Sequence, residues 1–100
     1  MLRALNSTDS VEVEGGARWF ERHPLDPERV VPLLLKGFEY PGTRSDCACA
    51  LRAYGPWARF AVERLVTLTR SKYPAVSLEA TWVLAGIDPE AAQKARVPSP

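Results

Sequence analysis

The sequence predicts an all-α fold, an α-α superhelix of about two helical hairpins with a flanking helix before them and a short helix after them. The first observation behind this prediction is an internal repeat. Three pairs of positions are separated by 33 residues: Pro41 and Pro74, Leu51 and Leu84, and Pro56 and Pro89. A period of this length is typical of stacked helical hairpins.

The second observation is the spacing of small and apolar residues within the two copies, at offsets of 0, 4, 7, 8 and 11. The residues are Thr43, Cys47, Ala50, Leu51 and Tyr54 in the first copy, and Val76, Ala80, Val83, Leu84 and Ile87 in the second. These offsets place each set in one stripe along a helix with 3.6 residues per turn. Both stripes are therefore expected to face the core.

The third observation is the composition, because 100 residues with 46% hydrophobic and 25% charged side chains are typical of one globular domain, residues 1–100. Residues 1–40 hold five basic and seven acidic side chains, a charge of −2, and residues 41–100 hold eight and five, a charge of +3. Neither part is basic enough to favour nucleic acid. No apolar run approaches the roughly 18 residues of a membrane span, and no secretory signal is evident. We therefore expect a cytoplasmic protein without a membrane segment.

Residues 1–14 are expected to form a loosely ordered lead-in, because turn and cap formers dominate residues 6–10. Residues 11–14 alternate between Val and Glu as a short strand would, and Gly15 and Gly16 end this alternation. Residues 15–25 are expected to form a flanking helix that ends before Pro24, since a proline biases the preceding residue away from helical geometry. Trp19 in this helix is expected to pack as a lid on the first hairpin.

Residues 26–55 form the first predicted repeat. Asp26 is expected to cap its first helix, and Pro27 takes the first helical position, where no hydrogen-bond donor is missed. This helix runs to about Phe38, and the Tyr-Pro-Gly sequence of residues 40–42 forms the turn. The second helix spans about residues 43–54.

Residues 56–88 form the second predicted repeat. A long helix is expected over residues 57–71, with Trp57 on its core stripe. The pair Tyr73 and Pro74 then repeats the turn, and the second helix spans about residues 76–87. The sequence Asp-Pro-Glu of residues 88–90 repeats the start signal seen at Asp26, so residues 89–96 are expected to form a partial third helix.

The two copies resemble HEAT and HEAT-like repeats, the group that includes the phycobilin-lyase type. The second helix of such a repeat typically begins with Pro, Val and Arg, continues with small residues and an Ala-Leu pair, and ends with Gly and Pro. The matching residues are Pro41, Arg44, Cys47, Ala48, Ala50, Leu51, Gly55 and Pro56 in the first copy, and Pro74, Val76, Ala80, Val83, Leu84 and Pro89 in the second.

The chain also departs from the HEAT pattern, since Tyr40 and Tyr73 stand where an Asp is usual and Ser77 replaces the Arg that Arg44 matches. The resemblance covers about two thirds of the chain. It implies a stack of hairpins that acts as a protein-binding scaffold, the role of most members, while a minority are enzymes or nucleic-acid binders.

A candidate binding face lies on the two second helices, opposite their core stripes. The second copy carries Leu78 and Trp82 on this face, and the first copy carries Ser45, Cys49 and Arg52. In a stacked array such positions line the concave face. An outward Trp beside a Leu predicts an apolar patch of the kind that marks an interface. We therefore expect a protein partner or self-association, with Leu78 and Trp82 as anchors and the other three residues as the rim.

Two alternatives for this face stay open. The N-terminal segment, through Trp19, would fold over Leu78 and Trp82 and complete the core. A small ligand would instead occupy the space between the helices.

The pair Cys47 and Cys49 does not predict a metal or redox site. A zinc site needs four ligands, and the only imidazole, His23, lies far upstream. Cys47 matches Ala80 in the repeat and is expected in the core, with Cys49 more exposed. No catalytic triad, HExxH or phosphate-loop pattern occurs, so we expect no catalytic residue and no cofactor.

Two further functions follow from the resemblance alone. The first is nucleic-acid binding in the manner of HEAT-like DNA glycosylases, through a strip of basic residues: Arg44, Arg52, Arg59, Arg64, Arg70 and Lys72. Two repeats offer a short groove, and a solvated outer face is the ordinary interpretation of such residues. The second is a subunit of a larger HEAT-like enzyme such as a phycobilin lyase, which would need several more repeats to build its pocket.

Overall fold

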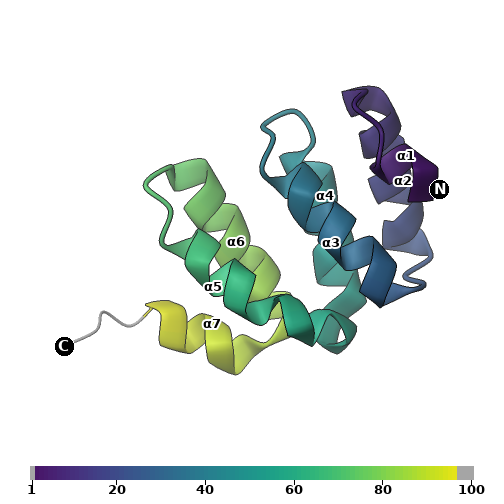
Figure 1. Ribbon diagram of the computed structural model, residues 1–100. Helices are drawn as coiled ribbons and strands as arrows, with labels where there is room; N and C mark the ends of the chain where they lie inside the picture. Colours follow the sequence, from purple (N-terminus) through teal and green to yellow (C-terminus); the bar gives the residue numbers. More distant parts are fainter. Residues whose placement is uncertain (1, 97–100) are drawn as a thin grey trace.

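Helices follow one another along residues 2–96, the part of the chain that this computed structural model describes, and no strand occurs in that range. In chain order the elements are α1 (Leu2–Leu5), α2 (Ser10–Arg22), α3 (Pro27–Phe38), α4 (Arg44–Tyr54), the 3₁₀ helix η1 (Gly55–Ala61), α5 (Val62–Thr69), α6 (Pro74–Ile87) and α7 (Pro89–Arg96). The arrangement, seen in Figure 1, confirms the predicted all-α class.

The helices form hairpins that stack in chain order, α1 with α2, α3 with α4, and α5 with α6, followed by α7 (Figure 1). Helices α2, α4 and α6 make one layer, because α4 packs between α2 and α6. The other layer holds α1, α3, η1 and α5, in which α3 contacts both α1 and η1. The two predicted hairpins are present as α3 with α4 and α5 with α6, and α1 and α2 add a hairpin before them.

The core lies between the two layers and contains every residue of the two predicted stripes, each of which is buried. Phe38 and Leu34 of α3 and Leu65 of α5 pack against these stripes from the opposite layer. Thr43 is the one buried polar residue among the described residues, and its hydroxyl donates a hydrogen bond of 2.6 Å to the carbonyl of Gly37. The helical period therefore identified the core face of α4 and α6 correctly.

Each second helix holds the end of the first helix in its own hairpin. The guanidinium of Arg44 donates to the carbonyls of Phe38 at 2.9 Å and Glu39 at 3.2 Å, which closes the end of α3. Ser77 is the equivalent of Arg44 in the second copy. Its hydroxyl donates to the carbonyl of Thr69 at 2.7 Å and so caps the C-terminal end of α5. The shorter side chain at Ser77 thus keeps the contact within the hairpin.

The expectation of a loosely ordered lead-in over residues 1–14 is wrong for the residues described, and residue 1 lies outside them. Helix α2 begins at Ser10 because the carboxylate of Asp9 accepts a hydrogen bond of 2.9 Å from the backbone N–H of Val11. Residues 11–14 belong to this helix, and Gly15 and Gly16, which were expected to end their alternating pattern, lie within it. At Gly16 the absence of a side chain allows close packing, since a Cβ atom there would lie 3.2 Å from Cβ of Ala4 in α1.

The expectation of one long helix over residues 57–71 is also wrong. The chain forms η1 first, with non-helical dihedral angles at Ala58, and only then α5. With three residues per turn, Ala58 and Ala61 share the buried face of η1, and Trp57 and Phe60 share the outer one. Trp57 is consequently 63% exposed and does not belong to the core.

The two Asp-Pro-Glu sequences start helices through different contacts. Asp88 acts as a side-chain cap of α7, because its carboxylate accepts a hydrogen bond of 3.1 Å from the N–H of Ala91. Asp26 does not, which corrects the prediction: its backbone is left-handed, with φ of 49°, and its carboxylate makes no cap hydrogen bond. A side-chain cap normally requires extended backbone, so the conformation of Asp26 explains the difference.

Candidate functional site

A groove of about 280 Å³ lies between α4 and α6, on the side of the layer that faces away from the core. Its lining residues are Ser45, Ala48, Cys49, Leu78, Glu79 and Trp82. Four of the five residues predicted for the binding face are therefore brought together here. The fifth, Arg52, lies beside them and contacts Trp82.

Two large apolar side chains flank this groove in contact with solvent. Leu78 is 71% exposed and Trp82 is 45% exposed, although the stripe of α6 that carries Leu84 is buried. The alternative in which Trp19 covers them does not hold, because both side chains are exposed and Trp19 instead stacks on His23 and packs edge to face on Phe20. Helix α2 packs on α4 and thus leaves the α6 side of the groove open.

Arg52 fixes the position of Trp82. Its guanidinium lies 4.4 Å from the centre of the indole ring and donates a hydrogen bond of 2.9 Å to the carbonyl of Trp82. The side chain of Arg52 reaches this place across Gly86, where a Cβ atom would overlap Cγ of Arg52. Gly86 is the positioning residue that the sequence analysis missed, since a glycine near the end of an apolar helix gives no sign of which side chain crosses it.

Glu79 is a second residue that was not predicted for this face. One of its carboxylate oxygens, Oε1, accepts a hydrogen bond of 3.3 Å from the hydroxyl of Ser45. The other oxygen, Oε2, is buried and has no hydrogen-bond partner among the described residues. A carboxylate in this state retains the capacity to accept further donors.

Cys49 lies where the groove meets a second hollow, which has a volume of about 480 Å³ and lies between α2 and α4. Burial raises the pKa of the Cys49 thiol, and the negative charges of Glu21, Asp46 and Glu79 raise it further. The thiol is therefore protonated at neutral pH and is a poor nucleophile. Glu21 and Asp46 line the second hollow beside Cys49, together with Arg18 and Arg22.

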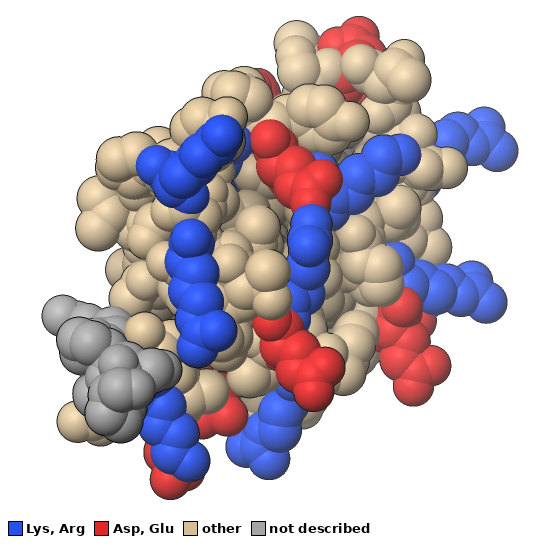
Figure 2. Space-filling view, turned by 60° about the vertical axis from the view of Figure 1, so that its left-hand side comes forward, with Lys and Arg blue, Asp and Glu red and all other residues tan. Residues whose placement is uncertain are grey.

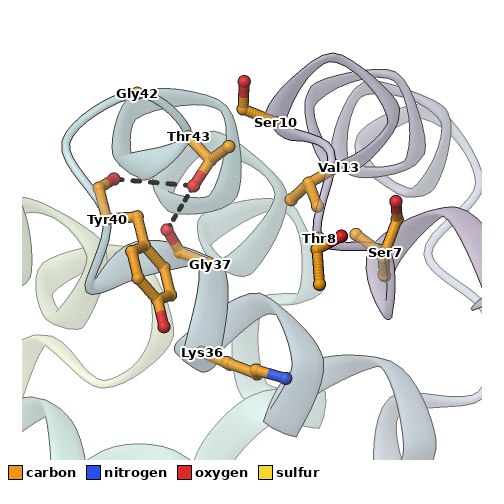
Figure 3. A pocket seen from close by; sticks show the side chains of 10 residues that line it. Ser7, Thr8, Ser10, Val13, Lys36, Gly37, Tyr40, Gly42 and Thr43 are labelled. Atoms are coloured by element: carbon orange, nitrogen blue, oxygen red, sulfur yellow. Dashed lines mark hydrogen bonds between the residues drawn. The ribbon is translucent and has the colours of Figure 1, made fainter.

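A separate pocket of about 320 Å³ lies where the turn between α1 and α2 meets the turn between α3 and α4 (Figure 3). Lys36 is its one charged lining residue. The buried hydroxyl of Thr43 is already used, since it donates to the carbonyl of Gly37 and lies 3.5 Å from that of Tyr40, the bonds dashed in Figure 3. The pocket depends on the N-terminal hairpin, which is why sequence analysis missed it. With its buried polar group paired, it is a weaker candidate than the groove.

The basic residues do not gather in one strip on the face shown in Figure 2, where Lys and Arg side chains are interspersed with Asp and Glu. Three members of the predicted strip already have partners within the chain. Arg44 donates to a carbonyl at the end of α3, Arg52 donates to the carbonyl of Trp82, and Arg64 forms an ion pair with Glu39. The ion pair offsets the charge of Arg64, and the hydrogen bonds to carbonyls occupy donors that phosphate oxygens would otherwise use.

Two kinds of site are absent within residues 2–96. No three His, Cys, Asp or Glu side chains come close enough together to hold a metal ion. No helix in this range has the length and apolar character needed to cross a membrane.

Cys47 is buried and Cys49 is half-buried, as the repeat predicted, and both thiols are free.

Comparison with protein-family models, with curated proteins and with solved structures found no significant match to this chain.

Proposed function

We propose that this chain is a protein-interaction module of the HEAT-like type, which binds its partner through the face formed by α4 and α6. The repeat of 33 residues and the stacking of the hairpins support the family. Leu78 and Trp82 would anchor the partner, and Ser45, Cys49 and Arg52 would surround the contact. Two free thiols fit a reducing compartment, so we place the module in the cytoplasm.

The observation that carries this proposal is the exposure of Leu78 and Trp82 together beside a groove. Exposed apolar side chains that cluster next to a concavity are typical of interfaces, and Trp is prominent among the residues that dominate binding energy. Because Arg52 already holds the indole ring, a partner would lose less conformational entropy in ordering Trp82.

The proposal is tested by comparing three baits in quantitative affinity capture: the wild-type chain, the double variant Leu78→Ser with Trp82→Ser, and the control Trp57→Ser. Trp57 is an exposed aromatic residue on η1, outside the proposed face, and so controls for the general loss of apolar surface. We expect specific proteins to bind the wild type and the control but not the double variant. Circular dichroism must show the same helical content for all three.

Light scattering at several concentrations comes first, because a second copy of the chain is also a possible occupant. A dimer that the double variant dissociates would identify self-association as the form that binding takes. The proposal would be refuted if the chain is a monomer and the double variant retains every protein that the wild type retains. It would also be refuted if the double variant unfolds, since Leu78 and Trp82 would then be part of the core.

A further inference from the structure

We infer that the groove between α4 and α6 accepts a lysine or arginine side chain from the partner, with Glu79 as its counter-ion. This inference rests on the proposed function and names the chemistry of the partner at that face. It follows from the state of one carboxylate, the character of the walls around it and the charge of the groove lining.

The carboxylate of Glu79 is incompletely paired. Oε1 has one long hydrogen bond from Ser45, and Oε2 is the one buried side-chain oxygen or nitrogen within residues 2–96 that has no partner. None of the ion pairs formed within these residues includes Glu79. A carboxylate can accept about four hydrogen bonds, so this one keeps the capacity to accept a further donor. Its last torsion angle is soft, which lets either oxygen turn toward a ligand in the groove.

The walls of the groove suit the aliphatic part of a long cationic side chain. Glu79 is the one charged residue that lines the groove, and the other lining residues are apolar or weakly polar. Leu78 and Trp82 offer apolar surface at the solvent side, along which the methylene groups of Lys or Arg can pack. A side chain of this kind packs its methylene groups on the apolar walls and places its charge at the carboxylate of Glu79. An apolar side chain would leave the carboxylate unpaired, at an energetic cost.

Glu79 gives the groove itself a negative charge, and the neighbouring guanidinium of Arg52 is already held by the ring and the carbonyl of Trp82. Glu21 and Asp46 lie with Cys49 along the adjoining hollow, which Arg18, Arg22 and His23 also line. Asp46 is paired with Arg18 at 3.2 Å, whereas Glu21 and Glu79 have no ion-pair partner within the described part of the chain. A metal ion is a less suitable occupant, because these side chains do not form a cluster of ligands.

The test uses short random peptides displayed on phage and selected on the wild-type chain, followed by binding measurements with the selected peptides made synthetically. We expect the peptides to share a Lys or Arg at one position, next to an apolar residue. Glu79→Gln keeps the shape of the side chain and removes its charge, and it should weaken binding by about tenfold. Replacing the shared Lys by norleucine should have a similar effect on the wild type and none on the Glu79→Gln variant.

The remaining outcomes separate the two hypotheses. Peptides that require Leu78 and Trp82 but share an apolar or acidic anchor, with full binding to Glu79→Gln, would overturn the inference and leave the proposed function intact. Peptides that bind equally to the Leu78→Ser and Trp82→Ser double variant would overturn the proposed function, and so would a library that yields no binder. The Trp57→Ser variant should bind every selected peptide as the wild type does.

Discussion

The close approach of α3 to α4 at Gly37 leads to a sharp prediction about stability. A Cβ atom at Gly37 would lie 2.5 Å from Sγ of Cys47, far inside van der Waals contact, in a core that includes both helices. Overpacking of this kind costs about 1–3 kcal/mol. The higher helix propensity of Ala offsets up to about 1 kcal/mol of that cost. We expect Gly37→Ala to lower the free energy of unfolding by about 1–2 kcal/mol, and Tm by about 5–15 °C.

The contact can be relieved by a second substitution at the partner residue. Cys47→Ala removes Sγ, after which the nearest atom to a Cβ at Gly37 is Cγ1 of Val13 at 3.4 Å, an ordinary contact. Alone, Cys47→Ala should cost about 1 kcal/mol, similar to the loss of one buried methylene group. The double variant should be no less stable than Cys47→Ala. The free energies of unfolding would then show a coupling of about 1 kcal/mol or more between the two sites.

Urea unfolding followed by circular dichroism measures all three free energies. Gly15→Ala is the matched control, because a Cβ atom there meets nothing within 4 Å and the residue lies inside α2. This control should gain about 0.5–1 kcal/mol from helix propensity alone. If the costs of Gly37→Ala and Cys47→Ala simply add in the double variant, the Sγ contact is not what requires glycine at position 37, and the reasoning fails.

Two further predictions concern the binding face and alkaline pH. Gly86→Ala should displace Arg52 from the ring of Trp82, which changes the tryptophan emission spectrum; an unchanged spectrum would mean that Arg52 does not depend on Gly86. Burial and the nearby charge of Asp46 raise the pKa of Cys47 from 9.0 to about 12. Because its unfolded form loses the proton first, the folded state should lose stability as the pH rises from about 9 to 12. Unfolding curves across that range check the sign, and a rise in stability would contradict it.

The repeat and its helical period were sufficient to predict much of the candidate site. Ser45, Cys49, Leu78 and Trp82 follow from positions opposite the core stripe, and the structure places all four along one groove. The period is a local property of the backbone, so it determines which side chains share a face without knowledge of the neighbouring helices. How those side chains pair across helices is not local, and the contacts of Arg52 were not predicted.

The sequence by itself determined the all-α class, the two repeated hairpins and the core faces of α4 and α6, because helical spacing and proline signals act over a few residues. Tertiary structure alone decided the rest. Helix α2 extends through Gly15 because its buried face packs on α4, and η1 replaces a helical turn where the chain bends from α4 into α5. The hydrogen bonds from Ser45 to Glu79 and from Arg52 to Trp82 likewise join residues 30 or more positions apart along the chain, which only the packing of α4 against α6 brings together.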